Sequence, residues 1–310
     1  MNPGYSLKQQ LLDRIRILSA PMQPVETGTL PRLQSLEGIK AVAFDFYGTM
    51  FMSGTGDTII DDPKGEEEQA LTKAFEVLFP DLMKGPGFDA LQGVQSYKQV
   101  IHDQKAALQQ EGIDYPEVQI TDVWEEVLAR MRKSGLEKLP QAPGEELLER
   151  LTIEFEMRNN PTWPLPDLDE TLHGLGAKGL LLGILSNSQF YTPMIFEAHL
   201  GSAPQQHIFE PNLCIWSYEE RRCKPSLPFH ESLKKAFDAH YGIAPEQVLF
   251  VGNDMLKDIY PAAHFGFKTA LFAGDDRSLK WRKDDERAAE LEPDLVITRL
   301  SQLLECLPGE

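Results

Sequence analysis

The sequence is poor in cysteine and in long apolar runs. Its 310 residues include three cysteines, Cys214, Cys223 and Cys306, and no CxxC pair. Such a set argues against a disulfide framework or a zinc site as the basis of the fold, and it suits a reducing compartment. The most apolar stretch, residues 179–185, is too short to cross a bilayer, and residues 1–10 lack the apolar core of a signal peptide. We therefore expect a cytoplasmic protein without a membrane span.

Positive charge is also scarce. The chain has 30 lysines and arginines against 48 aspartates and glutamates, which gives a formal net charge of -18. An excess of this size repels phosphate backbones and anionic lipid surfaces, so we expect neither nucleic acid nor a membrane as partner. A small anionic metabolite remains compatible, because its site needs only local positive potential.

The apolar pattern changes twice along the chain. The unbroken run at 41–44 predicts a strand buried on both faces, as in a parallel sheet. Residues 64–160 contain only helical periodicity, with stripes wide enough to pack on each other. From residue 164 strands and helices alternate, which is typical of a doubly wound sheet. The fold class is therefore α/β, a mainly parallel Rossmann-like sheet with an inserted α-helical cap.

Specific elements follow from this pattern. In the insertion, helices are predicted at 66–79, 89–111, 120–134 and 144–158. After it, helices are predicted at 167–177, 189–200, 227–241, 255–265 and 300–307, and strands at 180–185, 212–216, 247–251, 268–272 and 295–297.

The domain boundaries follow the same changes. We assign residues 1–52 and 161–310 to the α/β body and 53–160 to the cap. Residues 1–38 form an arm whose helix, near 6–19, docks on the body or on a partner subunit, so a homo-oligomer stays open. The glycine-rich segment after residue 52 reads as the turn of a small hairpin over 50–60.

Polar side chains follow several of the predicted strands. In an open parallel sheet, ligands bind at the carboxyl ends of the strands. The polar clusters at these ends are Asp45-Phe-Tyr-Gly-Thr49, Ser186-Asn187-Ser188, Lys224-Pro225 and Gly252-Asn-Asp-Met-Leu-Lys-Asp258. Together they supply what nucleophilic catalysis on an anionic, phosphorylated substrate requires.

The first cluster predicts a nucleophile. Asp45 stands at a strand end, where its carboxylate can attack a substrate in line and form an acyl-linked intermediate. Gly48 permits a sharp turn and a close backbone approach to an anion. Thr49 can bind the Asp45 carboxylate or the substrate.

The other clusters predict an anion site with a metal. Ser186 and Asn187 can donate hydrogen bonds to the transferred group, and Lys224 can neutralise charge between it and the nucleophile. Asp254 and Asp258 can bring Mg²⁺, a hard cation that prefers oxygen ligands. These two carboxylates lie four residues apart at the start of a predicted helix. They also suit a purely structural role there, because carboxylates near a helix N-terminus interact favourably with the helix dipole.

Taken in order, these four clusters resemble the motifs of the haloacid-dehalogenase-like superfamily, over about residues 40–307. The segment at 45–49 is similar to its nucleophile motif, and Ser186, Lys224 and the acidic segment at 252–258 to the next three. The resemblance implies a hydrolase whose helical cap covers the site. It also implies that the backbone carbonyl of Tyr47 joins Asp45 and Asp254 around Mg²⁺, with Asp258 orienting them.

Two departures from the family pattern keep the reaction open. Its phosphatases usually carry a second Asp where this chain has Tyr47, a residue that resembles the true haloacid dehalogenases, which work without metal. The fourth motif has Asn253 where many members have Asp. Against dehalogenation, the chain has no arginine between Asp45 and Arg130 for a halide cradle, and its fourth motif keeps two acids.

The sequence therefore predicts a Mg²⁺-dependent hydrolase of phosphate esters or acyl phosphates, acting through an aspartyl-phosphate. The alternatives are a metal-independent 2-haloacid dehalogenase and a weakly active binding or regulatory relative. Because Tyr47 cannot do a carboxylate's proton work near neutral pH, a phosphatase reading favours a substrate with a good leaving group.

Overall fold

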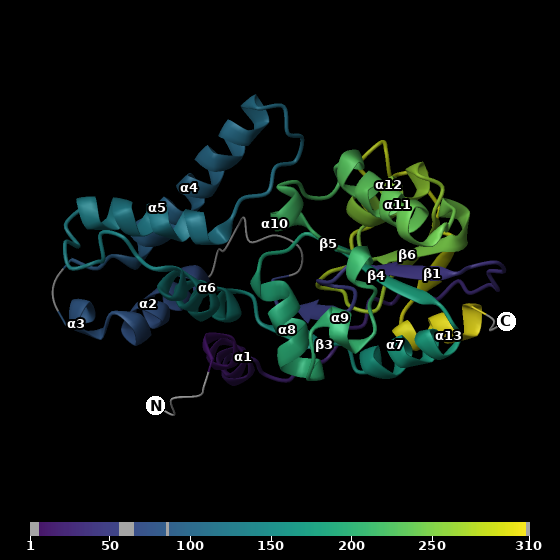
Figure 1. Ribbon diagram of the computed structural model, residues 1–310, viewed down its shortest axis with the longest axis horizontal. Helices are drawn as coiled ribbons and strands as arrows, with labels where there is room; N and C mark the ends of the chain where they lie inside the picture. The colour runs from purple at the N-terminus through teal and green to yellow at the C-terminus, as the bar shows by residue number, and fades with distance from the viewer. Residues whose placement is uncertain (1–5, 56–64, 85–86, 308–310) are drawn as a thin grey trace. The chain divides into compact units, whose positions relative to one another are not determined.

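The computed structural model describes residues 6–55, 65–84 and 87–307 (Figure 1). The chain divides into two compact units, Met1–Ala20 with Thr58–Pro161, and Pro21–Asp57 with Thr162–Glu310. The first is helical and the second is α/β. No helix within the described residues is both long and apolar enough to span a membrane.

A six-stranded parallel sheet organises the α/β unit. Its order is β5-β4-β1-β6-β7-β8, and every neighbouring pair runs parallel. The strands are β1 (Ala41–Phe44), β4 (Leu181–Ser186), β5 (Cys214–Trp216), β6 (Val248–Gly252), β7 (Lys268–Phe272) and β8 (Leu295–Ile297). The predicted fold class is confirmed, and the central β1 is buried at all four positions, as an unbroken apolar run predicts.

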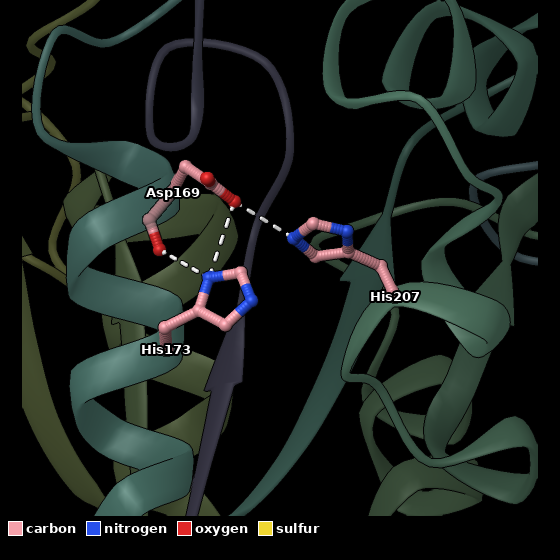
Figure 2. Close-up of side chains that lie close together, drawn as sticks. All are labelled: Asp169, His173 and His207. Carbon is pink, nitrogen blue, oxygen red and sulfur yellow. Dashed lines mark hydrogen bonds and ion pairs between the residues drawn. The ribbon is translucent and has the colours of Figure 1, made fainter.

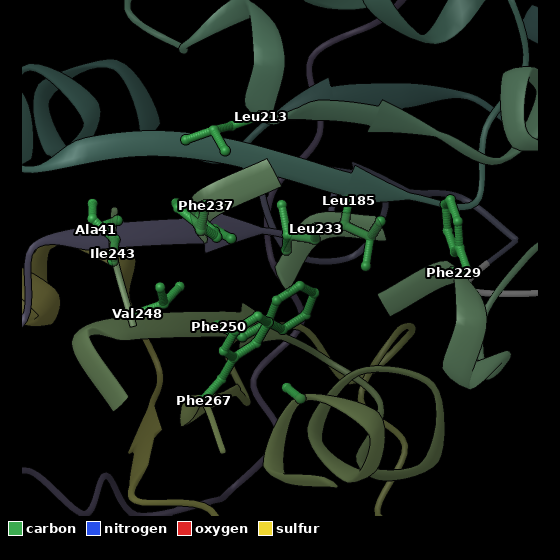
Figure 3. Close-up of a cluster of buried hydrophobic side chains, with 12 residues drawn as sticks. Ala41, Leu185, Leu213, Phe229, Leu233, Phe237, Ile243, Val248, Phe250 and Phe267 are labelled. Atoms are coloured by element: carbon green, nitrogen blue, oxygen red, sulfur yellow. The ribbon is translucent and has the colours of Figure 1, made fainter. Parts of the chain in front are cut away.

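Helices cover both faces of this sheet, with α11 and α12 on one side and α7 and α13 on the other (Figure 1). The helices are α7 (Leu168–Ala177), α8 (Tyr191–Leu200), α9 (Pro204–His207), α10 (Ser217–Glu220), α11 (Leu227–Tyr241), α12 (Tyr260–His264) and α13 (Leu303–Cys306). Short 3₁₀ turns span Pro211–Leu213, Pro245–Gln247 and Leu300–Gln302. Between sheet and α11, Phe229, Leu233 and Phe237 pack on side chains of β1, β4 and β6 (Figure 3). Burial of this apolar surface fixes the strand ends that carry the site.

One predicted helix differs in form. The segment expected as a helix over 255–265 starts with a π-helical turn, Met255–Ile259, followed by α12. The Asp254 side chain accepts hydrogen bonds from the amides of Leu256 and Lys257 and so caps this turn. The wider turn places Asp258 against Gly252, where an added Cβ would lie 2.3 Å from the Asp258 Cβ. Only a glycine therefore fits at the end of β6.

Among its described residues, the helical unit contains five helices from the insertion and one from the N-terminal segment. They are α1 (Leu7–Leu18), α2 (Glu66–Leu78), α3 (Pro80–Met83), α4 (Ala90–Gln110), α5 (Ile120–Lys133) and α6 (Glu145–Asn159). The four long insertion helices agree with the predicted ranges. Trp124 and Phe155, both fully buried, pack edge to face at 5.0 Å in the centre of this unit.

Helix α1 groups with the insertion, whereas we had assigned residues 1–38 to the α/β body. Its Leu11, Leu12 and Ile15 are buried, and Arg14 forms an ion pair with the buried Glu154 of α6. The carboxylate of Glu154 would be costly to bury alone, and Arg14 compensates it. The boundary between the two compact units thus falls within the arm, near Ala20.

The strand after the nucleophile segment has a distant partner. Strand β2 (Phe51–Ser53) pairs antiparallel with β3 (Thr162–Pro164), which follows the insertion. The second strand of the hairpin expected over 50–60 falls largely on residues outside the described ranges. The pairing of β2 with β3 thus joins the segment before the insertion to the segment after it, within the α/β unit.

Candidate active site

Asp45 is the first residue beyond β1, in the middle of the sheet. Its side chain is buried, and its amide donates to the carbonyl of Val251 in β6 at 2.9 Å. The chain then turns at Gly48, whose φ of +79° is in the left-handed region. A Cβ at Gly48 would lie 2.5 Å from the Cβ of Ser278, so a side chain has no room there. The turn presents the Asp45 carboxylate at the sheet edge, as predicted.

Lys224 joins the two carboxylates of the site. Its Nζ lies 2.5 Å from Oδ1 of Asp45 and 2.6 Å from Oδ1 of Asp258, and the side chain is only 3% exposed. Burial disfavours the charged amine, but the two carboxylates outweigh it and raise the pKa of Lys224. A positive charge therefore stands beside Asp45, the predicted nucleophile.

Asp258 accepts from three donors at once. Its Oδ2 accepts from the amides of Asn253 and Asp254 at 3.0 and 2.9 Å, while Oδ1 binds Lys224. Burial raises the pKa of Asp258 to about 7; Lys224 acts against this, and the charges of Asp45 and Asp254 add to it. Near neutral pH the Asp45–Lys224–Asp258 triad can take up or release one proton.

Asn187 and Ser186 lie at the end of β4, next to β1. The register pairs Phe44 with Ile184, so Asp45 and Ser186 reach the same sheet edge. Asn187 accepts from the Lys224 amide at 2.7 Å, which fixes the lysine loop. The structure thus gives Asn187 a positioning contact in addition to the substrate contact predicted for it.

The side chain of Tyr47 is directed to α8. Its hydroxyl lies 2.9 Å from Oγ1 of Thr192, within the α/β unit. A phenol does not replace a carboxylic acid as general acid near neutral pH. This contact holds the tyrosine side chain against α8.

The fourth motif turns Asn253, rather than Asp254, toward the nucleophile loop. Asn253 Oδ1 accepts from Oγ1 of Thr49 at 3.0 Å, and its Nδ2 donates to the Ser278 carbonyl. Asp254 instead binds Arg282, whose Nε lies 3.1 and 3.0 Å from the two carboxylate oxygens. Burial opposes the charge on Asp254, but Arg282 and backbone amides outweigh it and lower the pKa of this carboxyl.

These contacts decide whether the predicted donors suit Mg²⁺. The ion needs near-octahedral geometry and favours anionic oxygens. In this arrangement Lys224 pairs with Asp45 and Asp258, and Arg282 pairs with Asp254. The side chain that the fourth motif directs to Thr49 is the neutral amide of Asn253. The predicted set of Asp45, Tyr47, Asp254 and Asp258 does not fit a bound Mg²⁺ here.

The structure thus brings Asp45, Lys224 and Asp258 together and places Ser186 and Thr49 at their edge. Sequence reasoning did not assign Arg282, which lies 28 residues beyond Asp254 in a segment without a strand or helix pattern. It noted Asn253 without recognising its place beside Thr49. Part of the position of Asn253 could be predicted from the sequence. Asn253 directly follows β6, and β6 ends beside β1, which Asp45 follows.

Comparison with known proteins supports the architecture. The family model described as haloacid dehalogenase-like hydrolase matches residues 39–266. A HAD phosphatase from Thermococcus onnurineus has a similar structure, with 19% identity, a TM-score of 0.50, and coverage of 88% of this chain and 99% of that one. A 2-haloacid dehalogenase from Pseudomonas syringae pv. Tomato DC3000 is similar at 22% identity and a TM-score of 0.54, covering 86% and 97%. No curated protein matches the sequence.

Proposed function

Because the chain belongs to the haloacid dehalogenase-like hydrolase family, we propose that it hydrolyses small anionic substrates through an ester on Asp45 and without a metal ion at that residue. The observation that carries this proposal is the pairing of Asp45 with Lys224 at 2.5 Å. The fourth motif adds a neutral amide, Asn253, bound to Thr49. The lysine supplies the positive charge that would otherwise have to come from a cation.

The absence of a carboxylate at Tyr47 defines the class of leaving group. Tyr47 is bound to Thr192 and offers no acid near neutral pH, so the leaving group has to depart as a stable anion. Halide meets this condition. Substitution of a 2-haloacid at carbon is therefore the first reaction to test.

The chemistry balances in two steps. An Asp45 oxygen attacks the substrate carbon, the carbon–halogen bond breaks with both electrons on the halide, and an alkyl ester forms on Asp45. Water then attacks the acyl carbon of Asp45, which releases the hydroxy acid and regenerates the carboxylate. The proton of that water passes to a base, and Asp258, with a pKa of about 7, is the nearby group able to hold it.

A second candidate is Mg²⁺-dependent hydrolysis of a phosphate ester or acyl phosphate, as the sequence predicted. It is favoured by the hydroxyl of Ser186 and the ammonium of Lys224, which suit an oxyanion at this sheet edge. In that case Mg²⁺ binding would require the carboxylates to exchange their present partners.

One set of assays separates these reactions. Halide release from 2-chloropropionate in EDTA is expected, with loss in Asp45→Asn and retention in the control Asp238→Asn, an exposed aspartate on α11. A single turnover in water labelled with heavy oxygen is expected to leave the label in the peptide that contains Asp45. Turnover of acetyl phosphate or p-nitrophenyl phosphate only with Mg²⁺ would replace the proposal by the second candidate. No turnover of either class would leave the binding or regulatory relative.

A further inference from the structure

A second cluster of ionisable side chains lies on the α/β unit, formed by Asp169 and His173 of α7 and His207 of α9 (Figure 2). Nε2 of His207 is 2.8 Å from Oδ1 of Asp169, and Nδ1 of His173 is 3.3 Å from the same oxygen. These three atoms all lie within 4.8 Å of one another. One carboxylate oxygen and two imidazole nitrogens therefore converge on a small volume.

The local structure explains the convergence. Asp169 and His173 are four residues apart on α7, which places them on one face one turn apart. His207 comes from the last position of a different helix, and its ring packs edge to face on Phe196 at 5.4 Å. Ligands from two elements give a geometry that a single helix cannot provide.

The ring of His207 is also oriented for coordination. Its Nδ1 lies 3.1 Å from Oγ of Ser202, so Nε2 is the nitrogen directed at Asp169. Bonding of the far ring nitrogen to a protein oxygen is what usually fixes the tautomer and orientation of histidine ligands. Only 11% of the His207 side chain is exposed, which limits its freedom further.

We propose that Asp169, His173 and His207 form a binding site for one divalent transition metal ion, with Zn²⁺ the best match. Zinc takes histidine nitrogens and carboxylate oxygens at roughly 2.0–2.2 Å, which sets neighbouring ligand atoms about 3–4 Å apart. The separations in the structure need only small adjustments. His173 Nδ1 now also lies 2.9 Å from the Asp169 carbonyl oxygen, and that hydrogen bond would give way to the metal.

Access and charge favour this ion. Asp169 and His173 are more than half exposed, at 56% and 57%, so an ion can enter from solvent and keep water in its remaining positions. Such a site differs in chemistry from the Asp45 cluster, which contains no histidine. By joining α7 to α9, the ion would tie together two helices that precede different strands of the sheet.

The test is a titration of the full chain with Zn²⁺ by calorimetry, and with Co²⁺ followed by its visible absorption. We expect one site per chain, weakened about tenfold or more in Asp169→Asn and in His207→Gln, because each removes a ligand. The control variant His102→Gln removes an exposed histidine that pairs with Asp103 in the helical unit, and it should bind as the parent does. Asp45→Asn should also bind normally.

The readouts separate the outcomes. An increase in melting temperature with Zn²⁺ is expected for the parent chain and not for Asp169→Asn, because an ion that binds only the folded state stabilises it. Circular dichroism checks that each variant is folded. Absence of stoichiometric binding, or binding that Asp45→Asn abolishes and Asp169→Asn does not, would overturn the proposal.

Discussion

Replacing Lys224 by methionine tests the electrostatic core of the site. The substitution keeps the length of the side chain and removes the ammonium that lies within 2.6 Å of both Asp45 and Asp258. The two carboxylates are 8% and 1% exposed, so water cannot replace the lost charge. Removing one partner of a buried ion pair typically costs about 3–5 kcal/mol. We expect the free energy of unfolding to fall by roughly this amount.

The measurement is urea unfolding at pH 8, followed by circular dichroism and tryptophan fluorescence. At this pH Asp258 is mainly ionised in the parent, because its pKa is about 7. The matched control is Lys235→Met, which breaks an exposed pair with Glu231 on α11 and should cost about 1 kcal/mol or less.

A second variant distinguishes charge from packing. Lys224→Met combined with Asp258→Asn removes one orphaned carboxylate charge, so the pair should be more stable than Lys224→Met alone by about 1 kcal/mol or more. A loss below about 1 kcal/mol in Lys224→Met, or no recovery in the double variant, would show that Lys224 does not neutralise the two acids in the way described.

Three further predictions concern the neighbourhood of the triad. Arg282→Met should destabilise the fold by about 3 kcal/mol or more, because it leaves the Asp254 carboxylate buried without its guanidinium; urea unfolding beside the exposed control Arg287→Met measures this. Gly48→Ala should lower stability by about 1–3 kcal/mol and abolish turnover, because a Cβ would meet Ser278 at a φ of +79°; an unchanged melting temperature would contradict this. The pKa of Asp258 is raised to about 7, so the folded chain binds a proton that the unfolded chain releases near pH 4, and this contribution to stability is lost as pH rises through 7. Asp258→Asn should therefore gain stability relative to the parent between pH 5 and pH 8, and urea midpoints at both pH values check the sign.

Local patterns predicted most of the fold. The strand at 268–272 and the helix at 227–241 were predicted at the bounds observed, because apolar periodicity and a helix stop mark them directly. The pairing of β2 with β3 was not predicted, since 108 residues separate their ends and three-residue strands carry little pattern. The grouping of α1 with the insertion depends on Arg14 and Glu154, a contact that no local signal reveals.

The site was predictable to the extent that strand ends converge. Asp45, Ser186 and Lys224 follow parallel strands or the loops beyond them, so topology alone places them at one edge. The direction of each side chain was not predictable. Asp254 and Asn253 are neighbours in sequence, and only the capping of the π-helical turn decides which of them lies beside Thr49. The cluster of Asp169 with His173 and His207 was not predicted, because His207 follows His173 by 34 residues and belongs to a different helix.

The position of β1 in the sheet has a consequence for biosynthesis. Its two neighbours, β4 and β6, begin at Leu181 and Val248. Both hydrogen-bonding edges of Ala41–Phe44 therefore pair with residues that are synthesised much later. At synthesis rates of about 5–20 residues per second, the roughly 200 residues between β1 and β6 take on the order of 10–40 s to emerge. During that interval the nascent chain carries an unpaired apolar strand next to its future nucleophile, while the inserted helices can already fold. Yield of the native chain should therefore depend on how well chaperones shield residues 41–44 until translation has passed β6.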